Sequence, residues 1–500
     1  MIAINHAQID YAQLLQLAWP EIILVAAALV AVAVDLLLLR KQTTRLRFAV
    51  VASLGSLGCV AAILRLVLAP VQANILDGTL IANPLVRLVQ IAVLVLTIFI
   101  LLLSVDSRFT GHVGEFVLLV LIATTGMMFL VASQDLLVIF ISLELLSLSL
   151  YILAAFSKRS LQSWEAALKY FLFGGMSAAF LLFGFSLLYG LSNSTSLVAI
   201  AGAIHGPSLN PLLVIAIVTT TIGLGFKVAA APFHFWAPDV YQGAPAPSAA
   251  FIASASKVAS FFIFFQLAVL GFAGAEGTAA LPHIVRGWVP VLALVAAVSM
   301  VLGNLVAITQ SSLRRLLAYS AVAHAGYMLL AIVAHTQQSL AALLYYVVTY
   351  ALATIGAFAV IAVVEEQKGS DQLSHFDGLA RQAPALSLGL AIFILSLAGI
   401  PPLAGFFGKF YLFVTVLQAS KSLLWLVVLA IAMSAVSLYY YLKVLKRMYV
   451  TPLPPDAGKF ESPVLSQVIV AVLAAAVVLL GCAPHLLLRW IEAALPASGL

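Results

Sequence analysis

The feature that most constrains this chain is a series of apolar runs, each long enough to cross the roughly 30 Å hydrocarbon core of a bilayer. About fourteen such runs follow one another along the chain, joined mostly by short connections. Their approximate centres are residues 28, 58, 94, 124, 146, 178, 222, 258, 298, 324, 352, 402, 435 and 478. Because a helix satisfies its own backbone hydrogen bonds in lipid, the sequence predicts an all-α polytopic membrane protein with about fourteen transmembrane helices.

The composition supports this fold class and argues against several functions. Of the 500 residues, 64% are hydrophobic and 8% are charged, whereas roughly a quarter of a soluble chain is charged. The bases behind the net charge of +6 are scattered, so no nucleic-acid partner is expected. The two cysteines, Cys59 and Cys482, both lie in apolar runs, and no cluster of metal-ligand residue types has ligand spacing, so no metal site is expected.

The basic residues collect on one side of the predicted membrane. The opposite side has little beyond Arg286 and Lys421. By the positive-inside rule, the basic side is cytoplasmic, which places both termini on the non-cytoplasmic side of the membrane and requires an even number of spans. The basic side carries Arg40, Lys41, Arg45, Arg47, Arg108, Lys158, Arg159, Arg314, Arg315, Lys368, Arg381, Lys443, Lys446, Arg447 and Lys459. The first residues show no basic segment of a cleaved secretory signal, so the first span is expected to be retained.

Two predicted spans are interrupted in a similar way. Residues 223–247 read GLGFKVAAAPFHFWAPDVYQGAPAP, and residues 398–410 read AGIPPLAGFFGKF. Proline and glycine at this density break a helix, and the freed backbone groups must be buried in protein or line a hydrated cavity. A single proline kink is ordinary in a membrane helix. Two breaks about five spans apart, each with one lysine, instead indicate an inverted repeat of two five-helix units with a binding or conduction path between them.

Charged residues recur in the middle of the apolar runs. Glu144 lies near the centre of DLLVIFISLELLSLSLY and Lys257 near the centre of PSAAFIASASKVASFFIFF, while Lys227 and Lys409 lie at the two breaks. Lys169 is less clear, because Glu165 precedes it by four residues and the two side chains can form an ordinary surface ion pair.

A charge at mid-bilayer costs roughly 3 kcal/mol or more, so a purely structural role explains only one or two of these residues. Burial disfavours the charged form of a lysine or a glutamate, which brings both toward proton exchange at neutral pH. The pattern therefore predicts a proton relay. His234, inside the first break, and His324, in the middle of a span, are candidate proton carriers, although a lone histidine on a helix is often a packing residue.

With these residues identified, the chain resembles the antiporter-like membrane subunits of respiratory complex I, the NADH-quinone oxidoreductase. The resemblance covers most of the chain, and FHFWAPDVYQGAP is similar to the subunit N branch in particular. The other stretches that carry it are LELLSLSLYILAAF, EAALKYFLFG, GFKVAAAPFHFWAPDVYQGAP, SASKVA and AGIPPLAGFFGKF.

The resemblance implies a fourteen-helix fold with two inverted five-helix repeats, in which helices seven and twelve are broken. On this sequence the division becomes helices one to three in residues 1–110, a first repeat in 111–275, a second repeat in 276–450 and a last helix in 451–500. The broken helices then fall near 223–247 and 398–410.

The resemblance also implies roles for the buried charges. The glutamate that pairs with a nearby lysine in the family matches Glu144, and its partner would be Lys169. The central lysine of broken helix seven matches Lys227, the helix-eight lysine matches Lys257, and the last lysine of the relay matches Lys409. Histidines such as His234 and His324, together with water chains, would connect them.

As implied by the resemblance, the chain would be one subunit of an enzyme and would hold no redox centre of its own. NADH, FMN, iron–sulfur clusters and quinone would bind in partner subunits, and other membrane-arm subunits, including sister antiporter-like subunits, would be its partners. Two other functions remain open from the sequence: a subunit of a multi-chain cation/proton antiporter of the same fold, and a non-pumping scaffold whose buried charges only hold helices together.

Overall fold

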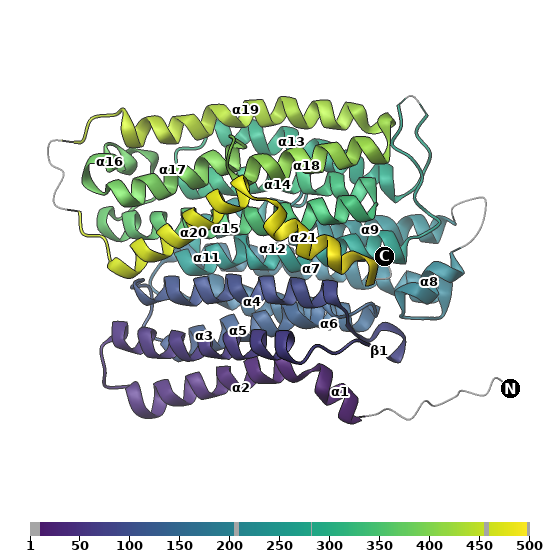
Figure 1. The fold of residues 1–500 in the computed structure, drawn as a ribbon, viewed down its shortest axis with the longest axis horizontal. Helices are drawn as coiled ribbons and strands as arrows, with labels where there is room; N and C mark the ends of the chain where they lie inside the picture. Colours follow the sequence, from purple (N-terminus) through teal and green to yellow (C-terminus); the bar gives the residue numbers. More distant parts are fainter. Residues whose placement is uncertain (1–10, 205–209, 282, 455–459, 498–500) are drawn as a thin grey trace.

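The computed structural model describes residues 11–204, 210–281, 283–454 and 460–497, so Lys459 and both ends of the chain lie outside the described residues. Within the described ranges the chain is a bundle of long helices (Figure 1). Thirteen of them are long and apolar enough to cross a membrane. In chain order these are α2 with η1 (Trp19–Leu39), α3 (Thr44–Leu68), α4 (Pro84–Val105), α5 (Val113–Val131), α6 (Leu136–Ala154), α7 (Leu161–Ser192), α9 (Pro211–Val228), α11 to η3 (Ala246–Gly271), α13 (Trp288–Ile308), α14 (Leu313–Ala334), α15 (Gln337–Lys368), η5 with α19 (Lys421–Tyr449) and α20 (Val464–Cys482).

Two shorter apolar helices account for the remaining predicted span. They are α17 (Pro384–Ala398) and α18 (Ala404–Ala419), and the predicted centre at residue 402 falls between them. The other thirteen predicted centres each lie within one of the long helices. The all-α polytopic fold class is therefore confirmed.

Short elements occupy the connections and the stretches before the first span and after the last one. The helical ones are α1 (Tyr11–Leu17), η2 (Leu76–Gly78), α8 (Leu197–Ala203), α10 (Trp236–Gly243), η4 (Leu373–Phe376), α16 (Leu379–Gln382), α21 (His485–Ala494) and η6 (Leu495–Ala497). Strands β1 (Ala73–Ile75) and β2 (Leu80–Ala82) form a two-stranded antiparallel ribbon in which Asn74 pairs with Ile81. This ribbon joins α3 to α4.

Polar residues placed just before the apolar runs explain where several helices begin. The Asp135 carboxylate accepts hydrogen bonds from the backbone N–H groups of Leu137 and Val138 at the start of α6, at 2.9 and 3.1 Å. Asn83 caps α4 in the same way, and Thr336 caps α15. These side chains satisfy N–H groups that have no partner inside a helix.

Most of the helices lie in layers that follow the order of the chain, whereas the last two, α20 and α21, cross the middle of the bundle in Figure 1. In Figure 1, α2 and α3 form one edge, α4 to α6 lie beside them, and α17 to α19 form the opposite edge. Nearly every residue of α14 and of the span from α11 to η3 is buried, whereas fewer than a third of the residues of α2 and α19 are buried. Helices α11, α12 (Ala255–Gln266), α14 and α15 therefore form the core of the bundle, where a buried charge is farthest from lipid.

Connections with many basic residues lie at one end of the bundle. The turn between α2 and α3, helix α16 and the connection from α19 to α20 lie at the left in Figure 1, and α1, α8 and β1 lie at the right. We call the left-hand end the basic face and the other end the opposite face.

Both predicted breaks are present. Helix α9 ends at Val228 and is followed by Ala229 in the left-handed conformation, with φ of 58°, and α17 ends at Ala398 and is followed by Gly399, with φ of 87°. Each break contains a cis peptide bond before a proline, Pro232 in the first and Pro402 in the second. The inverted repeat and the residue boundaries predicted for it stay predictions.

A third interruption was not predicted from the sequence. The span from Ala246 to Gly271 contains two α-helices, α11 (Ala246–Ala253) and α12, which are separated at Ser254, where φ is −125° and ψ is −87°. The interruption lies three residues before Lys257. All three core lysines thus lie close to a point where a helix is not continuous.

Candidate functional site

Lys227 lies in the last turn of α9, at the first break, where it faces α6. Its ammonium donates a hydrogen bond to the Ser147 hydroxyl and lies 5.7 Å from the centre of the Tyr151 ring. Glu144, one turn before Ser147, attracts Lys227 electrostatically. A cation at the carboxyl end of a helix is also stabilised by the helix dipole. The lysine predicted to pair with Glu144 was Lys169, so the electrostatic link between Glu144 and Lys227 was not part of that prediction.

Lys169 does not pair with Glu144 in this structure. Its ammonium lies 2.7 Å from Glu165 Oε1 and 2.7 Å from Asp239 Oδ2. The Lys169 side chain is 38% exposed. It lies on α7 at the side of the bundle, where both carboxylates are within reach. The Glu144–Lys169 pair implied by the family resemblance is thus replaced by two other ion pairs, one of them the surface pair with Glu165.

Asp239 is a functional candidate that the sequence reasoning missed. Its two carboxylate oxygens bind two different cations, since Oδ1 lies 2.6 Å from Arg315 Nη1 while Oδ2 contacts Lys169. The three residues come from α10, α14 and α7, so one carboxylate ties the first broken helix to helices on either side. The only available signal was a lone acidic residue inside the APDVY stretch of the break.

Lys257 is the most deeply buried of the core lysines, with 1% of its surface exposed. Its ammonium donates to the backbone carbonyl of Ala321 on α14 at 3.2 Å and lies 5.5 Å from the centre of the Tyr350 ring on α15. A cation over an aromatic face is stabilised by the ring quadrupole.

Lys409 reaches from α18 across the second break to the end of α17. Its ammonium donates to the carbonyls of Leu397 and Ala398 at 3.0 and 3.1 Å and to the Ser434 hydroxyl at 3.0 Å. The two carbonyls belong to the last turn of α17 and have no acceptor role inside that helix. Tyr327 lies beneath the ammonium, with its ring centre at 5.2 Å. The end of α17 at the break thus provides oxygen acceptors for the lysine ammonium.

His324 lies between two tyrosines. Its Nδ1 is 2.7 Å from the Tyr346 hydroxyl, and its Nε2 is 3.2 Å from the Tyr441 hydroxyl. The Tyr441 hydroxyl is in turn 2.5 Å from the Ser320 hydroxyl. Each hydroxyl in this series of hydrogen bonds can donate and accept, and each histidine nitrogen can do either, depending on the protonation and tautomer of the ring. His324 is therefore part of a continuous polar network.

The network occupies the space between two of the lysines. Lys257 and His324 both contact residues of α14 and α15, and Tyr327, on α14, contacts Lys409. Asn304 on α13 continues the polar contacts, since its amide donates to the Tyr327 hydroxyl at 3.0 Å. Tyr441 and Asn304 were not singled out from the sequence, and tyrosines in particular are common near the ends of membrane helices.

His234 lies in the first break, apart from this network. It is 2% exposed, and its Nδ1 has no hydrogen-bond partner among the described residues. Its ring stacks on Phe235 at 4.7 Å and meets the Tyr319 ring edge at 6.1 Å. A buried ring nitrogen without a protein partner is a place where water is stabilised.

We call Lys227, Lys257 and Lys409 the lysine row. Each member is buried, each neighbours a break or an interruption, and each contacts hydroxyl or carbonyl oxygens. An amine in such a place can bind a proton and release it to a water or to a hydroxyl. In the described part of the chain, no group of three or more histidines, cysteines and carboxylates is placed to hold a metal ion. The arrangement suits proton exchange.

A helical membrane bundle with buried lysines at broken helices belongs to the antiporter-like class of transport subunits, and the comparisons with known proteins agree. The family described as "NADH:quinone oxidoreductase/Mrp antiporter, TM" matches residues 133–434. The chain therefore belongs to the NADH:quinone oxidoreductase/Mrp antiporter family.

Curated relatives match over most of their length. The chain is 54% identical to NADH-quinone oxidoreductase subunit N 2 of Acidobacterium capsulatum, over 97% of this chain and 99% of the relative. It is 41% identical to NADH-quinone oxidoreductase subunit N 1 of Roseiflexus castenholzii, over 79% of this chain and 76% of the relative.

Solved structures agree with the fold. A chain of respiratory complex I from Thermus thermophilus with bound aureothin superimposes with a TM-score of 0.77 at 35% identity, over 94% of this chain and 98% of that one. A chain of the Mrp complex from Dietzia sp. DQ12-45-1b gives a TM-score of 0.81 at 19% identity, over 96% and 97% of the two chains. The second comparison supports the fold alone.

Proposed function

We propose that this chain is the antiporter-like subunit N of an NADH-quinone oxidoreductase and that it moves protons across the membrane. The relatives that match it over most of their length carry this subunit name. The observation that carries the mechanism is the lysine row, because three buried amines at helix breaks are costly unless their protonation is used.

The chain would act through charge. Electron transfer in partner subunits changes the charge state along the membrane arm, and this change reaches Lys227 through Glu144. A Lys227 ammonium that loses its attraction to Glu144 gives up its proton more readily, and Lys257 and Lys409 respond in turn. Each step transfers one proton from an ammonium through water or a hydroxyl to the next neutral amine, so no oxidant or reductant is consumed in this chain.

Side-chain networks would provide the connection along the lysine row. Between Lys257 and Lys409, the hydroxyls of Tyr346 and Tyr441 flank His324. A proton moves along such hydrogen bonds by successive transfers, in which each group gives one proton and accepts another. At the first break, the Nδ1 atom of His234 would bind a water molecule that takes part in proton transfer.

The redox chemistry would take place elsewhere in the complex. We place NADH, FMN, the iron–sulfur clusters and the quinone in partner subunits, in keeping with the family. The immediate partners are other membrane-arm subunits, including sister antiporter-like subunits. The basic face would be cytoplasmic, since basic residues are retained there during insertion, and both termini would then lie on the other side of the bacterial inner membrane.

The decisive experiment uses Lys227→Ala in the whole complex, reconstituted in sealed vesicles, with NADH-to-quinone electron transfer and proton uptake recorded together. Lys421→Ala is the matched control, because Lys421 is an exposed lysine at the opposite face. Mass spectrometry checks that all subunits are present. Loss of pumping in an assembled Lys227→Ala complex, with the control unchanged, supports the proposal, and normal pumping and turnover by Lys227→Ala contradict it.

The same preparation separates the two competing functions. A scaffold predicts that Lys227→Ala and Lys257→Ala impair assembly and give no assembled complex that fails to pump. A multi-chain cation/proton antiporter predicts that a sodium gradient alone drives proton movement in vesicles without NADH or quinone. Either result would replace the proposed function.

A further inference from the structure

Helix α20 lies in close contact with both halves of the second broken span, α17 and α18. A Cβ atom built on Gly389 of α17 would overlap the side chain of Val470 in α20. A Cβ atom built on Gly481, in the last turn of α20, would overlap the carbonyl oxygen of Pro402 and lie 2.5 Å from the nitrogen of Ala404, the first residue of α18. The contact at Gly481 is the stricter one, because backbone atoms cannot turn away as a side chain can.

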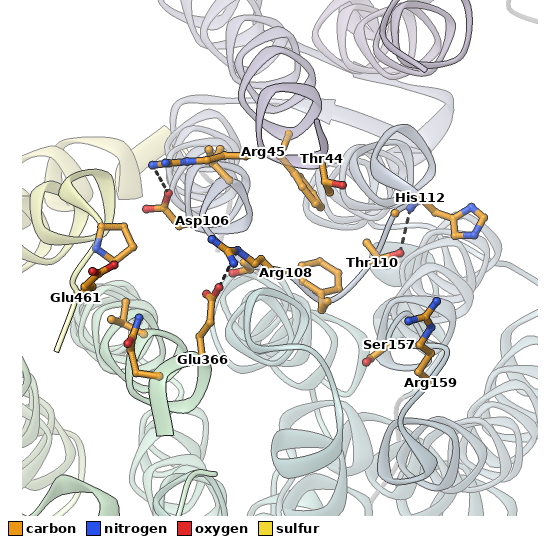
Figure 2. Close-up of a pocket in the computed structure, with 18 of the residues that line it drawn as sticks. Thr44, Arg45, Asp106, Arg108, Thr110, His112, Ser157, Arg159, Glu366 and Glu461 are labelled. Carbon is orange, nitrogen blue, oxygen red and sulfur yellow. Dashed lines mark hydrogen bonds and ion pairs between the residues drawn. The ribbon is translucent and has the colours of Figure 1, made fainter. Parts of the chain in front are cut away.

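The first turn of α20 is anchored at the basic face. There a cavity of about 1100 Å³ is lined by Asp106 and by Ser462 and Pro463, the two residues before α20. The Asp106 carboxylate accepts hydrogen bonds from the backbone N–H and the hydroxyl of Ser466, at 3.2 and 2.9 Å. Its other oxygen lies 3.3 Å from Arg45 Nη2, and Figure 2 shows this pair at the wall of the cavity. An anion at the first turn of a helix is favourable, so α20 begins at a fixed point at the end of α4.

The last turn of α20 is held by α15. The Tyr345 hydroxyl donates to the carbonyl of Leu480 at 2.8 Å, and the carbonyls of a last turn lack their usual partners inside the helix. The Tyr345 ring also meets the Phe407 ring of α18 edge-on, with 6.0 Å between the ring centres. In Figure 1 this end of α20 lies near the middle of the bundle, where it meets α21. One tyrosine therefore connects the end of α20 with the helix that carries Lys409.

The hydrogen bonds of Lys409 depend on how α18 lies relative to α17. The lysine belongs to α18, whereas the Leu397 and Ala398 carbonyls that it contacts at 3.0 and 3.1 Å belong to α17. The two halves also touch directly, where the Gly405 N–H donates to the Ser396 hydroxyl at 3.0 Å. Hydrogen bonds of this kind rarely exceed about 3.2 Å. A small displacement of the start of α18 therefore weakens the contacts of the ammonium.

We propose that α20 fixes the start of α18 against the end of α17 and that Gly481 is the positioning residue at this contact. By admitting the backbone of the break, Gly481 keeps the Lys409 ammonium within reach of the carbonyls of α17. Hydrogen bonds to an ammonium favour its charged form, so the contact sets how readily Lys409 takes up and releases a proton. The inference rests on the proposed function, because it affects pumping only if Lys409 exchanges protons.

Simple helix packing would also favour a glycine at this place, since small residues are common where membrane helices touch. The two roles differ in one measurable respect. A packing defect lowers the amount of assembled complex or slows it at every pH. A change in the hydrogen bonds of an ammonium changes the pH dependence of proton exchange instead. The titratable neighbours of Lys409, Tyr327 and His324 of α14, are not altered by a substitution at Gly481.

The test uses Gly481→Ala in the whole complex, in sealed vesicles, with NADH-driven proton uptake measured per assembled complex over a range of pH. Gly190→Ala is the matched control, because a Cβ atom built on this glycine of α7 has no atom of the described residues within 4 Å. We expect Gly481→Ala to lower uptake at least about threefold, since an overlap in a packed contact forces the backbone to shift. We also expect the alkaline limb of its pH profile to move about half a unit toward lower pH, because weaker hydrogen bonds make the ammonium easier to deprotonate.

Tyr345→Phe tests the same contact by a smaller change and decides the outcome if Gly481→Ala does not assemble. It removes the hydroxyl that holds the Leu480 carbonyl and keeps the ring against Phe407. We expect uptake to fall about twofold, with the pH profile moving in the same direction. Tyr189→Phe, at a residue that is 49% exposed on α7, is the control and should behave like the wild type.

The outcomes separate this inference from the proposed function. A wild-type pH profile for assembled Gly481→Ala overturns the inference, whether or not the rate falls, because α20 then has a packing role alone. If that variant does not assemble, a wild-type profile for Tyr345→Phe overturns it. When Lys227→Ala stops pumping in either case, the proposed function stands and only the role of α20 is wrong. If Lys227→Ala pumps normally, the proposed function fails whatever these variants show.

Discussion

Asp239 Oδ2 lies 2.7 Å from Lys169 Nζ, so this lysine binds a carboxylate from the short helix of the first break, in addition to Glu165, and does not pair with Glu144. The other oxygen of Asp239 binds Arg315. A change in the charge of any of these three groups is therefore felt by the other two, which places the first break under electrostatic control from two neighbouring helices.

Replacing Asp239 tests this control. Asp239→Asn keeps the shape and removes the charge between two cations, so Lys169 is released and proton pumping should fall by about fivefold, equivalent to the ~1 kcal/mol of a partly exposed ion pair. The measurement is NADH-driven proton uptake in sealed vesicles. Glu165→Gln removes the other carboxylate that binds Lys169. The Glu165 side chain is 61% exposed, so this variant should change pumping by less than about twofold. Equal effects of the two variants would show that Asp239 has no special position.

Tyr441→Phe tests the network around His324. The phenyl ring fills the same space, but the hydroxyl that contacts Ser320 and His324 is lost. Losing a hydrogen bond worth ~1 kcal/mol should slow pumping by about fivefold in a fully assembled complex. Tyr439→Phe is the control, because Tyr439 is 63% exposed on the same helix. Wild-type pumping by Tyr441→Phe would remove this hydroxyl from the proton path.

Asp35 supports the fold outside the lysine row. Both of its carboxylate oxygens accept from Arg47 at 2.7 Å, and the Gly114 N–H donates to it at 2.9 Å, so the pair ties η1, α3 and α5 together. The carboxylate is fully buried. Removing one partner of a buried pair leaves a charge uncompensated, and Asp35→Ala should lower stability by about 3–5 kcal/mol.

The stability change is measured as the heat-denaturation midpoint of the detergent-solubilised chain. Arg45→Gln breaks a pair with Asp106 in which the arginine side chain is 70% exposed, and it should cost less than about 1 kcal/mol. Similar midpoints for Asp35→Ala and the wild type would mean that the buried pair contributes no net stability.

An introduced cysteine at Lys421 tests the sidedness. Lys421 is exposed at the opposite face, at the start of η5, and in a Cys482→Ser background the remaining cysteine, Cys59, is buried. If the basic face is cytoplasmic, a membrane-impermeant maleimide should label Lys421→Cys in right-side-out spheroplasts and not in sealed inverted vesicles. The Cys482→Ser protein without the new cysteine should stay unlabelled. The reverse pattern would invert the proposed topology.

Much of this architecture follows from local sequence. The apolar runs predict the spans because the bilayer fixes their length, and the prolines and glycines near Lys227 and Lys409 predict the breaks because they prevent helical hydrogen bonding. Lysines in the middle of apolar runs were found because a charge there is costly.

Contacts between distant helices were not predictable in the same way. The interruption at Ser254 has no proline or glycine beside it. The hydroxyls of Ser254 and Ser256 donate to the carbonyls four residues earlier, a contact that bends helices but also occurs within continuous ones, as at Thr97. The Lys169–Asp239 ion pair and the hydrogen bond from Arg314 to the Ala244 carbonyl each join residues 70 positions apart. Arg314 was interpreted as an interfacial base, whereas the structure buries it against backbone carbonyls.

The depth of the lysine row has an electrical consequence. Its members lie at interruptions near the middle of their spans, so an ion passing from one lysine to the next travels mostly along the membrane plane. A unit charge that crosses the whole membrane against 100 mV requires about 2.3 kcal/mol, and a charge that reaches the middle requires about half of it. Transmembrane voltage should therefore slow the binding of protons to the lysine row from one side and their release from it to the other side. It should leave proton transfer between the three lysines nearly unchanged.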